Sequence, residues 1–335
     1  MRKRRNLLVT GGAGYIGSHI VKNLLKEDFS VTVFDNLSTG RIDPIEILQK
    51  NYDEIEFIKG DLSDKDLLID IFKERSIDAV IHLAAKIDVA ESVKNPTLYH
   101  EENFLGSINL LEAMTQAGVD KIIFSSTAAV YGNSQYTPID ENHPTNPTNP
   151  YGQTKLDFEK YLEQTQNLKY IIFRYFNVGG CDPAGLIGKS HLNSQDLIEN
   201  IMKVALGQKR IFQIFGGDFD TPDGTAIRDF VHVEDVASAH ILALENINKI
   251  SNQIFNLGCE QGYSVKEIID KASIITGKDL PTETVERRPG DIAVSVASAK
   301  KAKETLGWNP QYNDLDAIIR SDWNWRKTHS LGYTK

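Results

Sequence analysis

The sequence predicts an α/β protein that combines a Rossmann-type doubly wound parallel sheet with a smaller C-terminal α/β substrate lobe. Three observations lead to this prediction. Short apolar runs alternate with helical patterns through the first half of the chain, as a parallel sheet with crossover helices requires. A glycine-rich segment separates the first apolar run from the first helical pattern. The length of 335 residues exceeds the usual size of a single domain.

The first lobe is expected to cover residues 1–178, and the second residues 179–335. Apolar runs predict strands over 6–10, 30–34, 55–58, 78–83, 120–125 and 169–174. Apolar residues at helical spacing predict helices over 15–27, 63–74, 97–117, 151–166, 196–207, 235–246 and 264–276. A further apolar run near 254–258 is expected to return to the first lobe as a strand.

The glycine segment has the spacing G-x-x-G-x-x-G, formed by Gly11, Gly14 and Gly17. A sharp turn from strand to helix needs the backbone freedom of glycine. The missing side chains also let the backbone approach a pyrophosphate, which the free N–H groups at the start of the helix, around Tyr15 and Ile16, would bind. Gly17 allows the helix to pack closely on its strand. The segment therefore predicts a dinucleotide site.

The second predicted strand is followed directly by Asp35, an acidic residue at the distance from the glycines that suits the ribose hydroxyls of NAD. A carboxylate at this point would repel the additional phosphate of NADP. Arg41 lies close enough in sequence to keep NADP possible. Because the carboxylate is the stronger signal, NAD is the predicted cofactor.

Tyr151 and Lys155 are spaced i, i+4 and share one face of a predicted helix. A nearby ammonium group favours the phenolate of a tyrosine, which can then accept a proton from a sugar or alcohol hydroxyl. The strand that precedes them ends in the hydroxyl residues Ser125, Ser126 and Thr127. A hydroxyl at that edge of a doubly wound sheet can share the substrate proton with Tyr151.

The composition is that of an ordinary globular protein, and the net charge of -9 argues against nucleic acid as a partner. The basic run Arg2–Arg5 is interpreted as a solvated flank of the first strand. Cys181 and Cys259 do not have metal-ligand spacing, and no metal site is expected. We recognise no signal peptide and no membrane-spanning run, which predicts a cytoplasmic protein without a membrane partner.

These motifs together resemble the extended short-chain dehydrogenase/reductase family and, within it, the UDP-glucose (UDP-galactose) 4-epimerases. The resemblance covers nearly the whole chain. It includes the glycine segment and the segments 35–37, 60–61, 125–132, 151–155 and 174–177. Its most specific segments are 223–225, 228–233 and 287–291.

The resemblance implies roles for residues that the chemistry alone does not assign. Asp61 would contact the adenine, and Asn103 would help to hold the nicotinamide half. The implied cofactor-binding set is completed by Asn36, Leu62, Ser125, Tyr151 and Lys155. The second lobe would bind a UDP-sugar through Asn177, Arg228, Arg288 and Asp291, joined in the predicted substrate site by Thr127, Phe176, Leu197 and Ser295. A guanidinium group suits a diphosphate, since its fork of N–H donors matches phosphate oxygens.

The chain departs from the family pattern at several positions. Nucleotide-sugar 4,6-dehydratases carry Asp-Glu, and related decarboxylases a Glu, just after the hydroxyl run. This chain has Ala128 and Ala129 there, which favours simple redox epimerisation. A lysine that lies near the cofactor in one branch falls at Ile87, with Lys86 one position away, so this contact is not assigned. Asp196 stands where the family often has a His or Asn, and it places an acid near the diphosphate.

The predicted reaction is reversible inversion at carbon 4 of a UDP-hexose through a transient 4-keto sugar. Tyr151 would take the hydroxyl proton, Thr127 would relay it, and hydride would pass to bound NAD and back. Lys155 would tune Tyr151 and hold the nicotinamide ribose. One alternative is a related enzyme that acts on an N-acetylated or uronic UDP-sugar. Another is a non-catalytic NAD-sensing protein, which would not need this proton relay.

Two further expectations rest on the resemblance. Ser295 lies four positions after Asp291, where a large Tyr is typical of enzymes restricted to UDP-glucose and UDP-galactose. A small residue there removes exclusion by bulk, so UDP-GlcNAc and UDP-GalNAc are also expected substrates. The family also implies a homodimer through the helices near 97–117 and 151–166.

Overall fold

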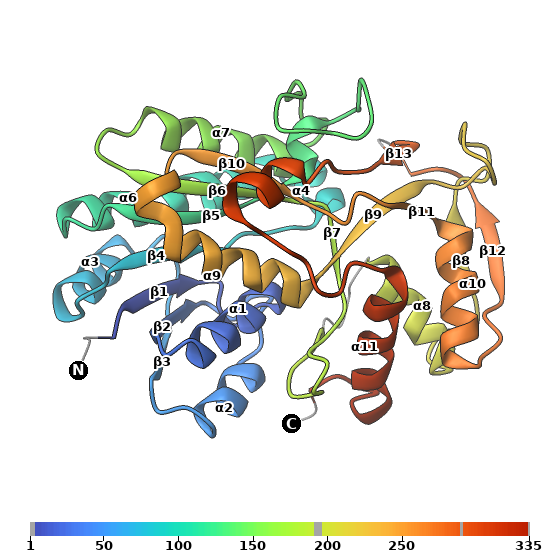
Figure 1. Cartoon of the computed structure of the whole chain (residues 1–335), viewed down its shortest axis with the longest axis horizontal. Coiled ribbons are helices and arrows are strands. Elements are labelled where there is room, and N and C mark those ends of the chain that lie inside the picture. The colour runs from blue at the N-terminus through green and yellow to red at the C-terminus, as the bar shows by residue number, and fades with distance from the viewer. Residues whose placement is uncertain (1–3, 191–195, 289–290, 334–335) are drawn as a thin grey trace.

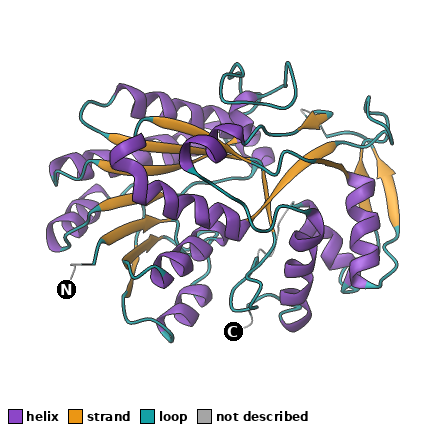
Figure 2. Ribbon diagram, in the orientation of Figure 1, coloured by secondary structure: helices purple, strands orange, loops and turns teal. Residues whose placement is uncertain are grey.

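The computed structural model describes residues 4–190, 196–288 and 291–333. Arg2 and Lys3 of the basic run, and Pro289 and Gly290 of the motif at 287–291, lie outside these ranges. At the centre is a parallel sheet with the strand order β10-β6-β5-β4-β1-β2-β3 (Figures 1 and 2). Its strands are β1 (Asn6–Thr10), β2 (Ser30–Asp35), β3 (Ile55–Lys59), β4 (Ala79–His82), β5 (Lys121–Thr127), β6 (Lys169–Tyr175) and β10 (Gln253–Leu257).

This sheet confirms the predicted Rossmann-type fold class. The first six strands lie within two residues of their expected bounds, because most of them are short apolar runs that are buried on both faces, as is typical of parallel sheets. The edge strand β3 is the exception, since it is partly exposed. The run near 254–258 forms β10, which pairs with β6 at the sheet edge. The chain therefore returns to the first sheet after it has built part of the second lobe.

Helices cover both faces of the sheet (Figure 1). On one face α1 (Tyr15–Lys26), α2 (Asp43–Gln49) and α9 (Val233–Ile250) share an apolar core with alternate strand residues such as Leu7 and Val9. On the other face α3 (Lys65–Glu74), α6 (Gly106–Gln116) and α7 (Pro150–Gln164) pack on the intervening residues, such as Leu8. The two cores follow from the period of two in a strand.

The helix expected over 97–117 is divided into three parts. α5 (Pro96–Tyr99) is followed by the π-helix η1 (His100–Leu105) and then by α6. The wider turn contains the buried Asn103, whose amide bonds both to the backbone N–H of Lys86 at 2.7 Å and to its carbonyl at 2.9 Å. Single π-turns inside helices are frequent at functional sites, and this one places a polar side chain beside the loop after β4.

The second lobe is built around β9 (Ile227–His232), which pairs with β7 (Asn177–Gly179), β11 (Gly262–Ser264) and β13 (Val294–Ser295). A separate pair joins β8 (Phe212–Phe215) to β12 (Thr282–Val285). The helices α8 (Leu197–Ala205), α10 (Val265–Thr276) and α11 (Leu315–Thr328) enclose an apolar core with these strands. The remaining short elements are α4 (Val89–Lys94), the 3-10 helix η2 (Ala128–Tyr131) and the π-helix η3 (Ala302–Leu306).

The second lobe was the least predictable part of the chain. Helices near α8, α9 and α10 are expected from the sequence, but the strands β7, β8, β9, β11, β12 and β13 and the helix α11 are not. These strands have two to six residues, too few to establish a period, and several are partly exposed.

Candidate active site

The glycine segment forms a tight turn between β1 and α1. Gly11 has a φ of +72°, and a Cβ there would lie 2.6 Å from the backbone nitrogen of Ala84. A Cβ on Gly17 would collide with the carbonyl of Gly11. α1 begins at Tyr15, and its N-cap Gly14 contributes no side-chain hydrogen bond to the first turn. Close packing therefore requires glycine at positions 11 and 17, and the first N–H groups of α1 are available to an anion.

Asp35 lies at the carboxyl end of β2, directly beside this turn. Its carboxylate accepts hydrogen bonds from the backbone N–H groups of Ala13 at 3.0 Å and Leu37 at 2.8 Å. Burial raises the pKa of Asp35, and the two hydrogen bonds oppose this rise. Arg41 does not pair with Asp35: its Nε donates to Asp43 at 3.0 Å, and its Nη2 donates to the carbonyl of Tyr333 at 2.9 Å.

The residues expected around the adenine gather at the ends of β2 and β3. Asn36 donates to Asp61 at 2.6 Å, and Asp61 also accepts from the backbone N–H of Ser63 at 2.9 Å. Burial tends to raise the pKa of Asp61, but these hydrogen bonds outweigh it and the pKa is lowered. Leu62 is buried against Gly106 at the start of α6. Asn103 lies near the same loops, but its amide is already bonded to the Lys86 backbone.

The proposed acid-base group lies at the carboxyl end of β5. Thr127 is the last residue of β5, and its hydroxyl lies close enough to the phenol of Tyr151, in the first turn of α7, to lower the pKa of that phenol. Lys155, one turn further along α7, donates from Nζ to the carbonyl of Ser125 at 2.8 Å and lies 4.7 Å from the centre of the Phe124 ring. β5 and α7 therefore bring the three predicted catalytic residues together.

Burial dominates the electrostatics of this group. It raises the pKa of Tyr151, and the nearby Thr127 hydroxyl opposes the rise. It lowers the pKa of Lys155 to about 7, against the attraction of Glu159. The sequence argument assigned the lowering of the Tyr151 pKa to Lys155. The structure differs because Lys155 is directed at the Ser125 carbonyl and is itself desolvated.

A buried chain of hydrogen bonds leads away from Ser125, and the sequence argument did not find it. The hydroxyl of Ser125 lies 2.8 Å from the Tyr175 hydroxyl, which lies 2.8 Å from Nε2 of His240 on α9. Nδ1 of His240 faces the carbonyl of Val236 at 2.9 Å, so this nitrogen carries the proton. Burial lowers the pKa of His240 to about 4, and the neutral ring therefore accepts from Tyr175. The hydroxyl of Ser125 is used within the protein.

A second buried network lies below Lys155. Glu159 accepts from Arg174 through Nε at 3.1 Å and Nη2 at 2.5 Å, and also from the Ser126 hydroxyl. Arg174 donates further to the Tyr131 hydroxyl at 3.0 Å. The spacing of Lys155 and Glu159 by four residues was the available sequence signal, since it puts both on one face of α7. The pair places a fixed negative charge one turn from Lys155.

The predicted substrate residues lie along β7, β9 and the segment that leads to β13. Arg228 on β9 is in register with Ser295 on β13, and the charge of Asp291 opposes the burial that lowers the pKa of Arg228. Arg288 is exposed, with its guanidinium 3.8 Å from the centre of the Phe215 ring. Asn177 begins β7 directly after Phe176, which is buried against Tyr131 and Ala297.

The two departures from the family pattern have clear positions. Asp196 caps the N-terminus of α8 by accepting from the backbone N–H of Glu199 at 2.9 Å, and it forms an ion pair with Lys189 at 2.9 Å. Lys189 therefore offsets the negative charge beside Leu197, the first residue of α8. Ile87 is 58% exposed in the loop that Asn103 holds.

The glycine turn, Asp35 and the Tyr151–Lys155 pair all lie within one region that matches a known protein family. Residues 7–258 match the family model described as the NAD dependent epimerase/dehydratase family, which spans the glycine turn, Asp35 and the Tyr151–Lys155 pair. The chain belongs to this family.

Relatives within the epimerase/dehydratase family match this chain over nearly its whole length. The UDP-glucose 4-epimerase of Halalkalibacterium halodurans is 46% identical over 98% of this chain and 97% of its own length. The crystal structure of UDP-glucose 4-epimerase from Bifidobacterium longum in complex with NAD+ and UDP has a TM-score of 0.93 at 36% identity, and covers 98% of this chain and 100% of that one. The UDP-Glc/GlcNAc 4-epimerase of Campylobacter jejuni has a TM-score of 0.85 at 40% identity, with 97% and 99% covered.

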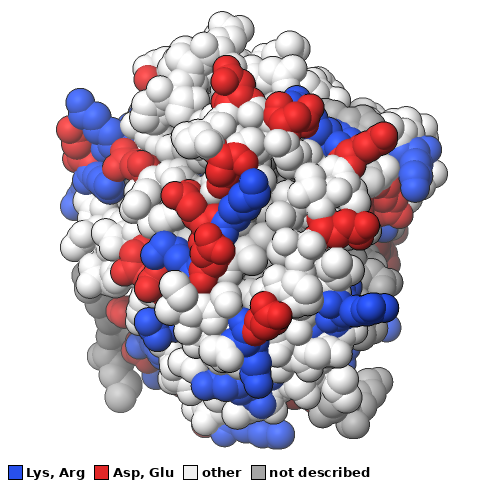
Figure 3. All heavy atoms as spheres, turned by 90° about the vertical axis from the view of Figure 1, so that its right-hand side faces the viewer, with Lys and Arg blue, Asp and Glu red and all other residues white. Residues whose placement is uncertain are grey.

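The described residues show neither a metal-binding cluster nor a membrane-spanning helix. In the described part of the chain, His, Cys, Asp and Glu side chains do not gather in threes as they would around a metal ion. Across residues 4–190, 196–288 and 291–333, every helix is too short or too polar to serve as a membrane span. On the face turned to the viewer in Figure 3, acidic and basic side chains are interspersed.

Proposed function

We propose that this protein is an NAD-dependent UDP-glucose/UDP-galactose 4-epimerase, which inverts carbon 4 through a transient 4-keto sugar. The observation that carries the proposal is the gathering of Thr127 and Tyr151 at the carboxyl end of β5, with Lys155 one helical turn away and bonded to the Ser125 carbonyl. Ala128 and Ala129 follow directly and contribute no carboxyl group, so no side chain at those two positions can catalyse loss of water.

NAD fits the residues at the proposed cofactor site. The uncapped first turn of α1 offers backbone N–H groups to a pyrophosphate, and close packing at Gly11 and Gly17 leaves no room for side chains. Asp35 would accept the adenosine ribose hydroxyls, and Asn36, Asp61 and Leu62 would surround the adenine. Bound NAD would supply a hydride acceptor and donor for carbon 4 of the sugar.

Tyr151 would accept the proton of the 4-hydroxyl, directly or through the Thr127 hydroxyl, and would return it after the sugar has turned over. Lys155 would favour the phenolate when protonated, since an opposite charge nearby stabilises the ionised form. Arg228 and Arg288, with Asn177 and Asp291, would keep the UDP part anchored while the keto sugar turns.

The experiment that tests the proposal supplies the purified protein with UDP-galactose, UDP-GalNAc and UDP-galacturonate in separate reactions, and identifies the products. Formation of UDP-glucose from UDP-galactose is expected. Conversion of the uronic sugar alone would favour a related enzyme, and no conversion of any sugar despite NAD binding would favour an NAD-sensing protein.

We also propose activity on UDP-GlcNAc and UDP-GalNAc, since the position expected to limit the pocket is the small Ser295. Ser295 on β13 is the strand partner of Arg228 on β9, so it lies beside a residue that is proposed to bind the diphosphate. A Ser295→Tyr variant should lose activity on UDP-GlcNAc and keep activity on UDP-galactose, because added bulk excludes the acetamido group first. A wild type that ignores UDP-GlcNAc, or a variant that keeps full activity on it, contradicts this proposal.

A homodimer through η1, α6 and α7 is the proposed assembly. Leu105 on η1 is 45% exposed and Tyr161 on α7 is 37% exposed, with Phe104 in ring contact with Tyr161. A second copy would cover these side chains. Light scattering of the wild type and of a Leu105→Glu, Tyr161→Glu double variant tests this, with a dimer and a monomer as the expected results. The cytoplasm remains the proposed location on the sequence grounds given above.

A further inference from the structure

The last described residues fold back from α11 towards the glycine turn. Residues 329–333, named here the C-terminal strap, begin with His329, whose ring stacks on Trp325 with centroids 4.6 Å apart. Gly332 has a φ of +74°, and a Cβ there would collide with the hydroxyl of Ser190. Tyr333 is buried, and its hydroxyl accepts from the Gly188 N–H at 2.8 Å and donates to the Gly188 carbonyl at 3.1 Å.

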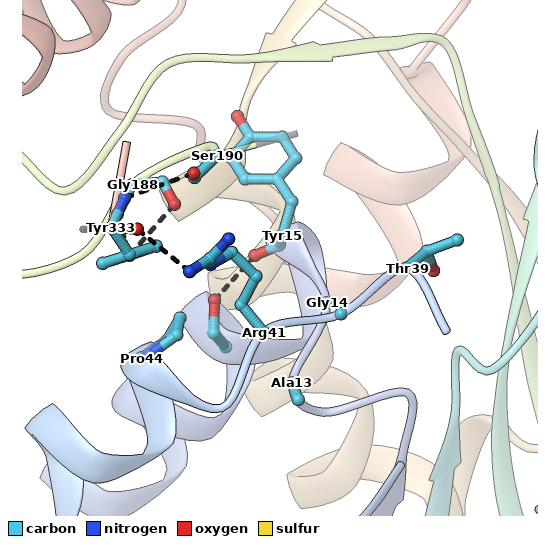
Figure 4. Close-up of a pocket in the computed structure, with 11 residues that line it drawn as sticks. Ala13, Gly14, Tyr15, Thr39, Arg41, Pro44, Gly188, Ser190 and Tyr333 are labelled. Carbon is cyan, nitrogen blue, oxygen red and sulfur yellow. Dashed lines mark hydrogen bonds between the residues drawn. The ribbon is translucent and has the colours of Figure 1, made fainter. Parts of the chain in front are cut away.

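Arg41 connects this strap to the proposed cofactor site, as Figure 4 shows. Its Nη2 donates to the Tyr333 carbonyl at 2.9 Å, and its Nε donates to Asp43 in the first turn of α2. Its backbone N–H donates to the carbonyl of Ala13, inside the glycine turn, at 3.0 Å. One residue thus joins the glycine turn, the start of α2 and the strap.

Arg41 lies at the end of the loop 36–41, which follows Asp35. Leu37 in this loop donates its N–H to Asp35. A Cβ on Gly40 would lie 3.1 Å from both the Ala13 carbonyl and the Asp35 carboxylate, so the loop packs on both. Displacement of Arg41 therefore shifts the backbone that orients Asp35 against the glycine turn.

We propose that Arg41 and Tyr333 are positioning residues for the adenosine half of the cofactor, and that the strap thereby increases the affinity for NAD. The inference rests on the proposed function, because it concerns the NAD site of that function. Neither side chain belongs to the proton-transfer group at Thr127, Tyr151 and Lys155. Loss of either contact lowers NAD affinity and leaves the chemical step intact once NAD is saturating.

The test measures NAD dissociation constants by calorimetry on nucleotide-free protein, together with turnover at saturating NAD. Arg41→Gln removes the guanidinium hydrogen bonds to Asp43 and to the Tyr333 carbonyl, and Tyr333→Ala removes the two phenol hydrogen bonds to Gly188 that hold this carbonyl in place. Each variant should raise the dissociation constant about tenfold, as expected for the loss of one or two hydrogen bonds. Turnover at saturating NAD should stay within about twofold, since no proton-transfer residue is changed. The matched controls are Leu331→Ala in the strap, where Leu331 is 72% exposed, and Arg320→Ala on α11, whose side chain is 61% exposed.

Each outcome decides the inference. Unchanged NAD affinity in both variants, or an equal loss in the controls, overturns it. If Tyr333→Ala does not fold, Arg41→Gln decides alone, because Arg41 lies at the surface end of the contact and its side chain is 26% exposed. A wild type that binds no NAD contradicts the proposed function instead, whereas a wild type that binds NAD as tightly as both variants contradicts only the role of the strap.

Discussion

At the scale of single residues, the proposed reaction depends on Tyr151 and the hydroxyl of Thr127. Burial raises the pKa of Tyr151, so the resting side chain is a phenol, and the nearby Thr127 hydroxyl opposes this rise. A proton acceptor at neutral pH therefore needs a positive charge close by when substrate is present. Lys155 is the nearest candidate on the same helix face, and its Nζ is held by the Ser125 carbonyl.

Removal of the Tyr151 hydroxyl tests this role. Tyr151→Phe should reduce kcat by roughly 10²–10⁴-fold, the range typical of a general acid-base group, while UDP-sugar binding persists. Steady-state kinetics and calorimetric titration with UDP-glucose measure the two effects. Near-normal turnover would remove Tyr151 from the mechanism. Tyr161→Phe, on the exposed face of the same helix, is the matched control.

Lys155 gives a prediction about pH and stability. Burial lowers the pKa of Lys155 from its ordinary value of 10.5 to about 7 in the folded protein, so the unfolded chain binds the additional proton between these values. Below pH 7 the folded protein bears the full free-energy cost of burying the charged ammonium group. This cost decreases as the pH rises from about 7 and is lost above 10.5, where Lys155 is neutral in both states. Lys155→Met should therefore gain more stability relative to the wild type at pH 6 than at pH 9. Urea unfolding at both pH values measures the difference, and a gap that is independent of pH contradicts the lowered pKa.

At the scale of elements, β5, β6 and α7 together position the site. β5 ends in Ser125–Thr127, β6 ends in Tyr175, and Tyr151 lies in the first turn of α7. Buried polar chains connect these elements, because each hydroxyl and carboxylate at the strand ends must find a partner once it is removed from water. His240 extends one of these chains to α9, so that a helix on one face of the sheet supports residues at its edge.

The chain from Ser125 through Tyr175 to His240 predicts coupled stability effects. His240→Leu should destabilise the protein by about 1–3 kcal/mol, since the Tyr175 hydroxyl is left buried without its acceptor. Adding Tyr175→Phe should cost less than it does in the wild type, with a coupling of at least about 0.5 kcal/mol in a double-mutant cycle. Strictly additive free energies of unfolding would show that the two side chains are independent.

The elements also show how far the sequence predicts this fold. Most strands of the first sheet were predictable because burial on both faces makes them continuous apolar runs. The Tyr151–Lys155 pair was predictable because i, i+4 spacing defines a helix face. The π-helix at Asn103 was not predictable, since Asn103 bonds to the backbone of Lys86 in the loop after β4, a contact that no local pattern predicts. The His240 chain was missed for the same reason: its members are 65 and 50 residues apart in sequence.

At the scale of the whole molecule, a buried charge cluster joins α1, the helix at the proposed NAD site, to Asp182 and to α9. Lys22 on α1 donates to Asp182 at 2.7 Å and to Glu234 at the start of α9 at 2.6 Å. His19, on the same helix face, bonds to Glu234 at 2.5 Å. Lys22 is 1% exposed, so its ammonium group has these carboxylates as partners in place of water.

This cluster predicts that the contacts of Lys22 on α1 with Asp182 and Glu234 contribute strongly to the stability of the fold. Lys22→Met should lower the free energy of unfolding by about 3–5 kcal/mol, because it leaves two buried carboxylates without their cation. The control Lys73→Met breaks the pair of Lys73 with Asp70, whose side chains are 68% and 61% exposed, and should cost less than about 1 kcal/mol. Equal effects of the two variants in urea unfolding would contradict a structural role for the cluster.

The most direct test of the proposed function follows one reaction with UDP-galactose and a small amount of NAD. The expected result is an equilibrium mixture of UDP-galactose and UDP-glucose, with many sugars converted per NAD and no rise in NADH absorbance. Such a result requires that hydride leaves and returns to the same sugar within each turnover. Net accumulation of NADH in step with product would identify a dehydrogenase and would contradict the 4-epimerase proposal.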